Sequence, residues 1–225
     1  MAPSRVGDGA RADPAVVAAW VAGWALSRGV GPPEAVHGGH YVEVGLPRHQ
    51  ARYVFASIET GRLRRLAETI ADPWIFLKVC TPADALEAAW PEGWVVQTPG
   101  FMMTTELAGT AAAHPVAPAP GYTLSLDGDR LITASIMGAD GALAASGKVA
   151  LADGHATFDQ IVTDENHRRR GLGQTVMRAL GAAAVERGVR QAVLVATPMG
   201  RELYTALGWR LHAHYTTAVI PGPEE

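Results

Sequence analysis

The sequence predicts an α/β protein built on a mixed sheet, and three observations predict it. Apolar residues make up 48% of the 225 residues, which is enough for a sizeable core. Short segments with the two-residue alternation of strands recur along the chain, and segments with helical spacing separate them. In the second half, three alternating segments joined by tight turns form a strand meander, which a helix–strand–helix–strand order follows.

The first half begins with a helix whose two ends are marked in the sequence. Asp13 is a typical N-cap residue, Pro14 suits the first helical turn, and Gly29 suits the residue that ends a helix. Further along this half, the pattern predicts helices at 62–70 and 81–90, and strands at 41–44, 52–56, 74–80, 94–96 and 101–103.

A stretch rich in alanine and proline at 111–120 divides the chain. Its prolines exclude a continuous helix or a central strand, so we interpret it as a linker. The expected organisation is therefore a flexible tail at 1–12, an N-terminal αβ domain at 13–110, the linker, and a C-terminal domain at 121–225.

The second half has the more regular pattern. Turns at Asp140-Gly141 and Asp153-Gly154 separate alternating segments, as in a meander of antiparallel strands. The predicted elements are strands at 122–126, 132–136, 143–151 and 156–163, a helix at 173–187, a strand at 191–196, a helix at 199–207 and a strand at 209–220.

Composition excludes several classes of protein. The net charge of −3, without a basic tract, argues against a nucleic-acid binder. The longest apolar stretch, Pro14–Leu26, is shorter than the roughly 20 residues of a membrane span, so no membrane partner is expected. Cys80 is the one cysteine, which excludes an internal disulfide and fits a reducing cytoplasm.

The stretch from Ile161 to Gln174 carries the clearest chemistry. A predicted strand ends at Thr163, a polar loop follows, and a turn with Gly171 and Gly173 opens a long helix. The first helical turn has unpaired N–H groups and a partial positive charge, and glycines let an anion approach the backbone. Three arginines precede the turn. The stretch therefore predicts a pyrophosphate site.

Other interpretations of this stretch fit less well. A Walker loop requires Gly-Lys-Ser/Thr, which does not follow, and a dinucleotide fingerprint requires a third glycine. Three arginines by themselves are typical of an ordinary surface patch.

Taken with its surroundings, this stretch resembles the acyl-CoA pyrophosphate motif of the GNAT superfamily of N-acetyltransferases. The pattern is Val162 followed by Arg168-x-x-Gly171-x-Gly173. The meander precedes it, and a segment resembling the family's LYxxLGF follows it at Leu203–Trp209, with Trp in place of Phe. The resemblance covers about residues 121–220.

The resemblance implies a GNAT acyl-CoA-transferase fold whose sheet is splayed between the strands at 156–163 and 191–196. Pantetheine would pair with the backbone of the first of these strands, at Ile161, Val162 and Thr163. The residues expected at the pyrophosphate are Arg168, Arg169, Arg170, Gly171, Leu172, Gly173 and Gln174.

Two residues are candidates for catalysis. Tyr204 matches the family's tyrosine position and would donate a hydrogen bond to the departing thiolate. Asp159 lies just before the motif and would take the amine proton as a general base. A pairing of Asp159 with an arginine or with the acceptor amine is the alternative. Positioning alone could also supply much of the rate.

Other reactive side chains are assigned structural roles. Cys80 lies in an apolar segment, as inert core cysteines do. The pairs His37/His40 and His212/His214 lack an evident third ligand, so no metal is expected. His214 and Tyr215 are expected to line the acceptor pocket, because the final strand borders that pocket in the family that the chain resembles. Most of the tryptophans are expected in the core, with one or two of them walling the acceptor site; they are Trp20, Trp24, Trp74, Trp90 and Trp94.

The first half repeats the order of elements of the second half. Gly93-Trp94 and Gly208-Trp209 occupy similar places, but the turn at 57–62 has one glycine and an acidic residue. The first half is therefore either a degenerate GNAT-like copy that binds no CoA or a chance match of two common patterns.

The predicted function is an acetyl-CoA-dependent N-acetyltransferase that acts on a primary amine of a small molecule or a peptide, by direct attack in a ternary complex. The alternative is a non-catalytic acyl-CoA-binding or sensing module. Acetyl-CoA is expected as co-substrate and an unidentified amine as acceptor, and a homodimer stays open because exposed strand edges often pair.

Overall fold

The computed structural model describes residues 11–110 and 113–223. Within these residues the helices begin and end close to where the sequence predicts them. Asp13 caps the first helix through its Oδ1, which accepts a hydrogen bond from the N–H of Ala15 (2.8 Å), and Gly29 ends it with a φ of 67°. The helices are α1 (Pro14–Arg28), α2 (Thr60–Thr69), α3 (Leu172–Glu186) and α4 (Pro198–Ala206), with 3-10 turns η1 (Asp84–Ala89) and η3 (Glu165–His167).

The strands of the first half include a short strand that the sequence pattern did not reveal, at Glu34–Val36. The expected α-helix at 81–90 is a 3-10 helix, and the expected piece at 101–103 lengthens into a continuous strand. The strands are β1 (Glu34–Val36), β2 (Gly39–Leu46), β3 (His49–Phe55), β4 (Ile75–Val79), β5 (Val95–Val96) and β6 (Gly100–Glu106).

The second half contains the predicted meander and the predicted order of elements after it. Its turn at Asp153-Gly154 has positive φ at both residues, 47° and 73°, as a tight hairpin turn requires. The strands are β7 (Tyr122–Asp127), β8 (Leu131–Gly138), β9 (Leu143–Ala152), β10 (His155–Thr163), β11 (Gln191–Ala196) and β12 (Arg210–Val219).

One continuous sheet passes through the part of the chain that the structure describes. Its strand order is β1-β2-β3-β4-β12-β6-β11-β10-β9-β8-β7, with β5 paired to β12. The sheet is mixed, because β3 and β4 pair in parallel, as do β10 and β11, while the other pairs are antiparallel. The expected mixed α/β fold is confirmed.

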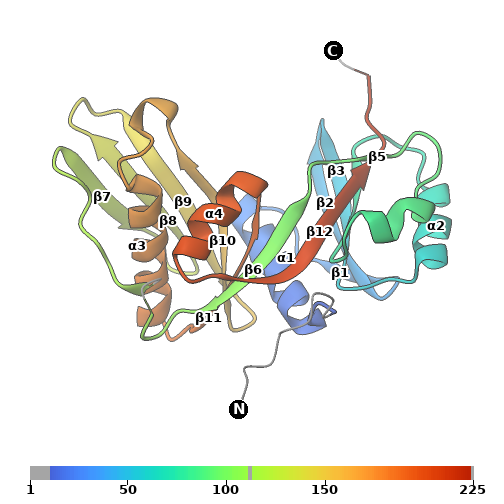
Figure 1. The fold of residues 1–225 in the computed structure, drawn as a ribbon, viewed down its shortest axis with the longest axis horizontal. Coiled ribbons are helices and arrows are strands. Elements are labelled where there is room, and N and C mark those ends of the chain that lie inside the picture. The colour runs from blue at the N-terminus through green and yellow to red at the C-terminus, as the bar shows by residue number, and fades with distance from the viewer. Residues whose placement is uncertain (1–10, 111–112, 224–225) are drawn as a thin grey trace.

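Strands from the two sides of the 111–120 stretch interleave in this sheet. β6, which precedes that stretch, lies between β11 and β12, which follow it. The end of β12, from Thr216 to Val219, pairs with β4 of the first half. The two halves are therefore joined by backbone hydrogen bonds, and Figure 1 shows β6 and β12 crossing the middle of the molecule. The division into a tail, two domains and a linker stays a prediction, and residues 1–10, 111 and 112 lie outside the described residues.

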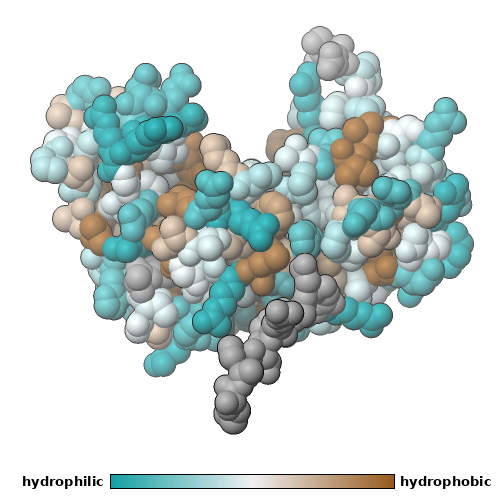
Figure 2. All heavy atoms as spheres, viewed as in Figure 1, coloured by the Kyte–Doolittle hydropathy of each residue, from teal (hydrophilic) through white to brown (hydrophobic). Residues whose placement is uncertain are grey.

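Helices cover both faces of the second half's strands. α3 packs on β8, β9 and β10, and α1 packs on β9 and β10; Figure 1 shows α1 behind the strands and α3 in front of them. Gly23 permits this close packing of α1, because a Cβ there would lie 2.2 Å from Oγ1 of Thr157 on β10. The first helix of the chain thus packs on the strands of the second half, including β10, which is expected to bind the cofactor. The space-filling view shows a notch in the surface between the two ends of the molecule (Figure 2).

Candidate active site

Two adjacent strands separate in the middle of the sheet. β10 and β11 pair in parallel over only three residue pairs, the last of which is Thr157 with Val193. Beyond it, β11 continues along β6 as far as Ala196, and β10 continues along β9 as far as Thr163. The edge of β10 that faces β11 is therefore free of a partner strand over Ile161, Val162 and Thr163. An extended ligand can add to such an edge by backbone hydrogen bonds.

A bulge lies at the point of separation. The register of β10 against β9 shifts between Asp159 and Val162, and Gln160 has a φ of 55°, a left-handed conformation that non-glycine residues seldom adopt. Bulges of this kind redirect side chains and are frequent beside active sites. Here the bulge directly follows Asp159.

The loop after β10 leads into the N-terminus of α3. Asp164 accepts a hydrogen bond from the N–H of Asn166 (2.9 Å) and so orders the first turn of the loop. Gly171 then forms the N-cap of α3 with a φ of 75°. The N–H groups of the first turn of α3 have no partner within the helix and point toward the end where the helix dipole favours an anion.

The two glycines of this loop have different roles. Gly171 is required by the backbone, because its positive φ disfavours any side chain. Gly173 is not required by the protein itself: a Cβ there would make ordinary contacts, at 3.4 Å to Thr163 and 3.6 Å to Leu203. The space at Gly173 is thus open for a bound group, and the loop fits a pyrophosphate.

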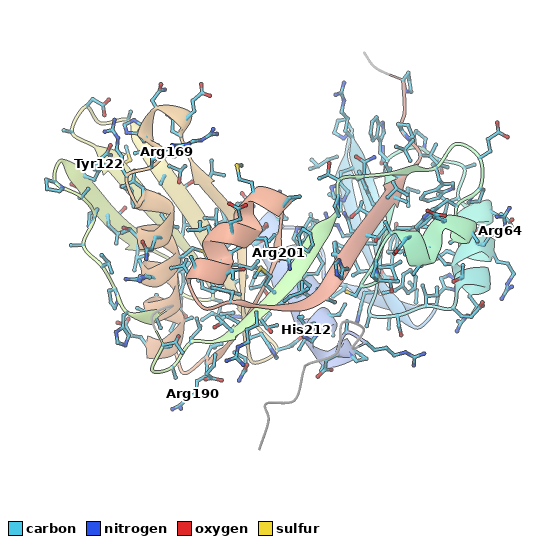
Figure 3. The ribbon with its side chains drawn as sticks, viewed as in Figure 1. Arg64, Tyr122, Arg169, Arg190, Arg201 and His212 are labelled. Carbon is cyan, nitrogen blue, oxygen red and sulfur yellow. The ribbon has the colours of Figure 1, made fainter. Side chains whose placement is uncertain are left out.

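The three arginines of the loop also differ. Arg168 and Arg169 are exposed, and Figure 3 shows Arg169 at the outer end of the molecule near Tyr122. Arg170 instead donates hydrogen bonds to the hydroxyl of Tyr122 (2.6 Å) and to the carbonyl of Asn166 (3.3 Å). Within the part of the chain that the structure describes, Arg168 and Arg169 have no ion-pair partner, whereas Arg170 braces the loop against β7.

Tyr204 lies on α4, whose N-terminus is capped by Thr197 through a hydrogen bond from the N–H of Gly200 (3.1 Å). The Tyr204 ring is packed against the core, 6.2 Å from the ring of Trp209. Burial raises the pKa of the phenol to about 12, and the charge of Asp159 contributes in the same direction. The phenol therefore stays protonated and able to donate a hydrogen bond at any physiological pH.

Asp159 forms an ion pair with Arg28 at the end of α1. The Nε of Arg28 lies 2.6 Å from Oδ2, Nη2 lies 3.1 Å from Oδ1, and the Ser27 hydroxyl donates to Oδ2 at 2.6 Å. Burial would raise the pKa of Asp159, but the hydrogen bonds from Arg28 and Ser27 outweigh it, so the pKa is lowered. A carboxylate with a lowered pKa is a weak base. The structure thus shows the pairing with an arginine that is the alternative to a general base.

A cavity of about 180 Å³ adjoins Asp159. Its walls come from both halves of the chain, with two tryptophans of α1 on one side and residues of β3, β4, β10, β11 and β12 on the others. The lining residues are Trp20, Trp24, Arg52, Lys78, Phe158, Asp159, Val195 and Tyr215. Of the aromatic residues expected at the acceptor site, Trp20, Trp24 and Tyr215 line the cavity, whereas His214 packs against Phe101.

Sequence patterns did not single out Arg52 and Lys78. Lys78 lies within an apolar strand and Arg52 begins the predicted strand 52–56, and a basic residue in such a segment is the signal that identifies them. Arg52 is 6% exposed, and its guanidinium lies 3.2 Å from the centroid of the Trp24 ring. Lys78 is half-buried and donates to the hydroxyl of Thr217 (3.2 Å).

The cysteine and histidine candidates lie in surroundings that do not favour catalysis or metal binding. Cys80 is buried, and burial raises the pKa of its thiol to about 12, so it is no nucleophile at neutral pH. Nε2 of His212 accepts a hydrogen bond from the N–H of Asp13 (3.0 Å).

Across 11–110 and 113–223, no three His, Cys, Asp or Glu side chains gather as a metal site would need. No helix in the same residues is long and apolar enough to cross a membrane.

Comparison with known proteins agrees with this geometry. Residues 65–209 match the family described as the acetyltransferase (GNAT) family. The match begins before residue 121, so the likeness extends beyond the segment 121–220 on which the sequence resemblance rested. A search of curated proteins found no match.

Solved structures with the same fold are distant in sequence. A GCN5-related N-acetyltransferase from Kribbella flavida is 17% identical with a TM-score of 0.68, and the alignment covers 92% of this chain and 96% of that one. A GCN5-related N-acetyltransferase from Sphaerobacter thermophilus is 13% identical with a TM-score of 0.59, and the alignment covers 96% of this chain and 96% of that one. A tandem GNAT protein from the clavulanic acid biosynthesis pathway is 19% identical with a TM-score of 0.50, over 74% of this chain and 69% of that one.

Proposed function

The chain belongs to the GNAT family of acetyltransferases, and from this premise we propose that it transfers an acetyl group from acetyl-CoA to a primary amine. The observation that carries the proposal is the separation of β10 from β11 directly before a helix N-terminus built on Gly171. The first feature offers an open strand edge to pantetheine, and the second offers unpaired N–H groups to a pyrophosphate.

Acetyl-CoA supplies an activated thioester, and the chain's own residues position it. The free edge of β10 at Ile161, Val162 and Thr163 holds the pantetheine by backbone hydrogen bonds. The N–H groups at the start of α3, from Leu172 to Gln174, hold the pyrophosphate, with Arg168 and Arg169 beside them. This arrangement brings the thioester to the place where the strands separate, next to Asp159 and the cavity. Holding both reactants there lowers the entropic part of the barrier.

In the transfer step the neutral amine attacks the thioester carbonyl, the new C–N bond forms and the C–S bond breaks. The phenol of Tyr204 donates a hydrogen bond to the departing thiolate, a role that suits a group whose pKa is raised to about 12. Asp159 is held ionised by Arg28 and Ser27. We assign it to orienting the acceptor amine, whose proton leaves to water.

The first half of the chain is proposed to be a degenerate copy of the second. In support, β3, α2 and β4 form a parallel pair with a connecting helix, as β10, α3 and β11 do. α2 begins after Glu59, whose carboxylate accepts hydrogen bonds from the N–H groups of Gly61 and Arg62. That carboxylate occupies the place where an anion would bind, so this copy holds no pyrophosphate.

Calorimetric titration of acetyl-CoA into wild type and the Gly173→Glu variant tests the proposal. The glutamate fills the space at Gly173 with a negative charge, which repels the negatively charged pyrophosphate. Binding of acetyl-CoA should therefore be lost while the fold is kept. Gly31→Glu is the matched control, because it carries the same change of charge at an exposed glycine where an added Cβ would meet no atom within 4 Å.

Release of free thiol with a panel of amines then separates an enzyme from a sensor. Turnover with any amine supports the transferase. Binding without turnover across the panel supports the sensing module. Absence of acetyl-CoA binding by the wild type would overturn both.

A further inference from the structure

The cavity beside Asp159 contains basic side chains that no acidic side chain balances. Arg52 is almost completely buried, and Lys78 lines the same cavity. Among the described residues, no carboxylate lies within ion-pair distance of either. The one acidic residue on the cavity wall, Asp159, is already paired with Arg28. A buried cation without a partner is costly, so such an arrangement is uncommon unless a ligand completes it.

The neighbours of Arg52 do not supply the missing negative charge. Its Nε and Nη2 lie 3.2 Å and 3.1 Å from Nε2 of His49, and its flat face lies on Trp24. Burial, together with the charge of Arg52, lowers the pKa of His49 to about 3, so this imidazole is neutral. Arg52 itself remains protonated at neutral pH, although burial lowers its pKa to about 10. Asp159 acts on Arg52 only from beyond ion-pair distance and is already paired with Arg28, so the positive charge of Arg52 is held in place with no carboxylate of its own.

Tyr215 adds a donor to the same cavity. Its side chain is 4% exposed, and its hydroxyl has no hydrogen-bond partner among the residues that the structure describes. An unsatisfied buried hydroxyl costs free energy in the empty protein.

Lys78 also has donors to spare. It uses one on Thr217 and has others available. Burial and the charge of Arg52 lower the pKa of its amine, and an anion bound beside it would raise that pKa again. Arg52, Lys78 and Tyr215 thus all have unused hydrogen-bond donors. An anion, which accepts hydrogen bonds, is the ligand that suits such a group of donors.

We propose that the acceptor is a small amino acid, whose carboxylate binds Arg52, Lys78 and Tyr215 while its amine lies toward Asp159 and the separated strands. This inference rests on the proposed transfer to an amine and names the class of acceptor. Because Asp159 shares the cavity wall, a monoanion with an amine nearby fits better than a phosphate dianion. The cavity volume of about 180 Å³ leaves room for an acceptor of this size.

Matched acceptors test the proposal by activity. Each of the twenty amino acids is compared with its amide and with the amine that lacks the carboxylate, and phosphoethanolamine is included as a phosphate-bearing amine. The expected result is a kcat/KM for the best amino acid about tenfold or more above those of its two analogues. Equal rates within every series, or a preference for phosphoethanolamine, would overturn the carboxylate site. Transfer to amines of any kind would still leave the proposed function standing.

Binding tests the same site without turnover. Trp20 and Trp24 line the cavity, so tryptophan fluorescence can follow titration with propionate and with the N-acetyl derivative of glycine. Wild type should bind these carboxylates, and Arg52→Met, Lys78→Met and Tyr215→Phe should each weaken binding by about tenfold or more. The control Arg65→Met, on an exposed part of α2, should bind as wild type does. Equal titrations of wild type and the cavity variants would contradict the proposal, as would no response from wild type.

Thermal unfolding separates a binding role from a structural one. Methionine keeps the volume of Lys78 and removes an amine that the empty cavity leaves poorly compensated, so Lys78→Met should unfold at a higher temperature than wild type. A lower unfolding temperature together with unchanged carboxylate binding would assign Lys78 to the fold instead.

Discussion

The guanidinium of Arg28 and the carboxylate of Asp159 lie 2.6 Å apart, although the two residues are 131 positions apart in the sequence. The contact joins the end of α1 to the bulge of β10, the place where the sheet opens. Asp159 is 16% exposed and Arg28 is 42% exposed, so the pair is partly shielded from water. It fixes both the position of the first helix and the charge state of the acid beside the cavity.

Arg28→Gln should destabilise the fold in a pH-dependent manner. Because the pKa of Asp159 is lowered in the folded protein, the pair stabilises the fold above the unfolded value of about 3.9 and ceases to do so as pH falls through the folded pKa. At pH 7 the variant should lose about 1–2 kcal/mol in urea unfolding, less than a fully buried pair would, because Arg28 is partly exposed. The difference from wild type should shrink toward pH 2.

The matched control for Arg28→Gln is Arg64→Gln, which breaks a pair with Glu68 at 3.0 Å whose two side chains are about half exposed. Its effect should stay within about 0.5 kcal/mol at either pH. Equal losses in the two variants, or a loss in Arg28→Gln that does not depend on pH, would show that the ion pair with Asp159 is not what stabilises the opening.

Tyr204→Phe should slow transfer without weakening the binding of acetyl-CoA. Among residues 11–110 and 113–223 the phenol oxygen makes no hydrogen bond, and the ring contacts remain in phenylalanine. Loss of the donor should lower kcat about 100-fold or more, the usual range for a general acid. Steady-state kinetics and calorimetry measure the two effects. Tyr53→Phe, at a half-buried tyrosine that packs against the core of the first half, serves as control. A kcat for Tyr204→Phe equal to that of Tyr53→Phe would remove Tyr204 from the mechanism.

Local patterns were sufficient to predict most elements and the glycine turn that opens α3. Asp13, Pro14 and Gly29 mark the first helix through capping contacts that involve only neighbouring residues. Gly171 is recognisable from the sequence because a positive φ in a turn requires glycine at that position. Such signals depend on short-range contacts, and short-range contacts are what a single sequence displays.

The acceptor side of the site could not be predicted in the same way. β6 inserts between β11 and β12, and α1 packs on β10, so the cavity joins residues from strands that are neighbours only in space. Arg52 begins a predicted strand and Lys78 interrupts an apolar one, but nothing local shows that both face one cavity with Tyr215. Which side chains face the cavity depends on the register between strands from different halves, and that register is set by the whole sheet.

Alanine at the two glycines of the loop should have opposite effects. Gly171→Ala should lower stability by about 1 kcal/mol, because φ is 75° there. Gly173→Ala should leave stability equal or slightly higher, because its methyl meets only ordinary contacts and alanine favours the helix. Its affinity for acetyl-CoA should nevertheless fall. Thermal unfolding and calorimetry on both variants check this, and an unchanged affinity in Gly173→Ala would place the pyrophosphate elsewhere.

Gly23→Ala should separate α1 from the strands that it covers. A methyl at this position would lie 2.2 Å from Oγ1 and 2.4 Å from Cβ of Thr157, so either the helix or β10 must move. Overpacking of this kind costs about 1–3 kcal/mol. Because Trp20 and Trp24 flank Gly23 on the same helix, the shift should also weaken acceptor binding while leaving the loop before α3 intact. Urea unfolding and separate titrations of acetyl-CoA and acceptor measure the three effects.

The control for Gly23→Ala is Gly31→Ala, where no atom lies within 4 Å of the added methyl, and its stability should change by no more than about 0.5 kcal/mol. Adding Thr157→Gly to Gly23→Ala removes the clashing side chain, so the double variant should lose less stability than the sum of the two single changes. Additive losses, or normal acceptor binding in Gly23→Ala, would mean that the close crossing of α1 over β10 does not shape the acceptor cavity.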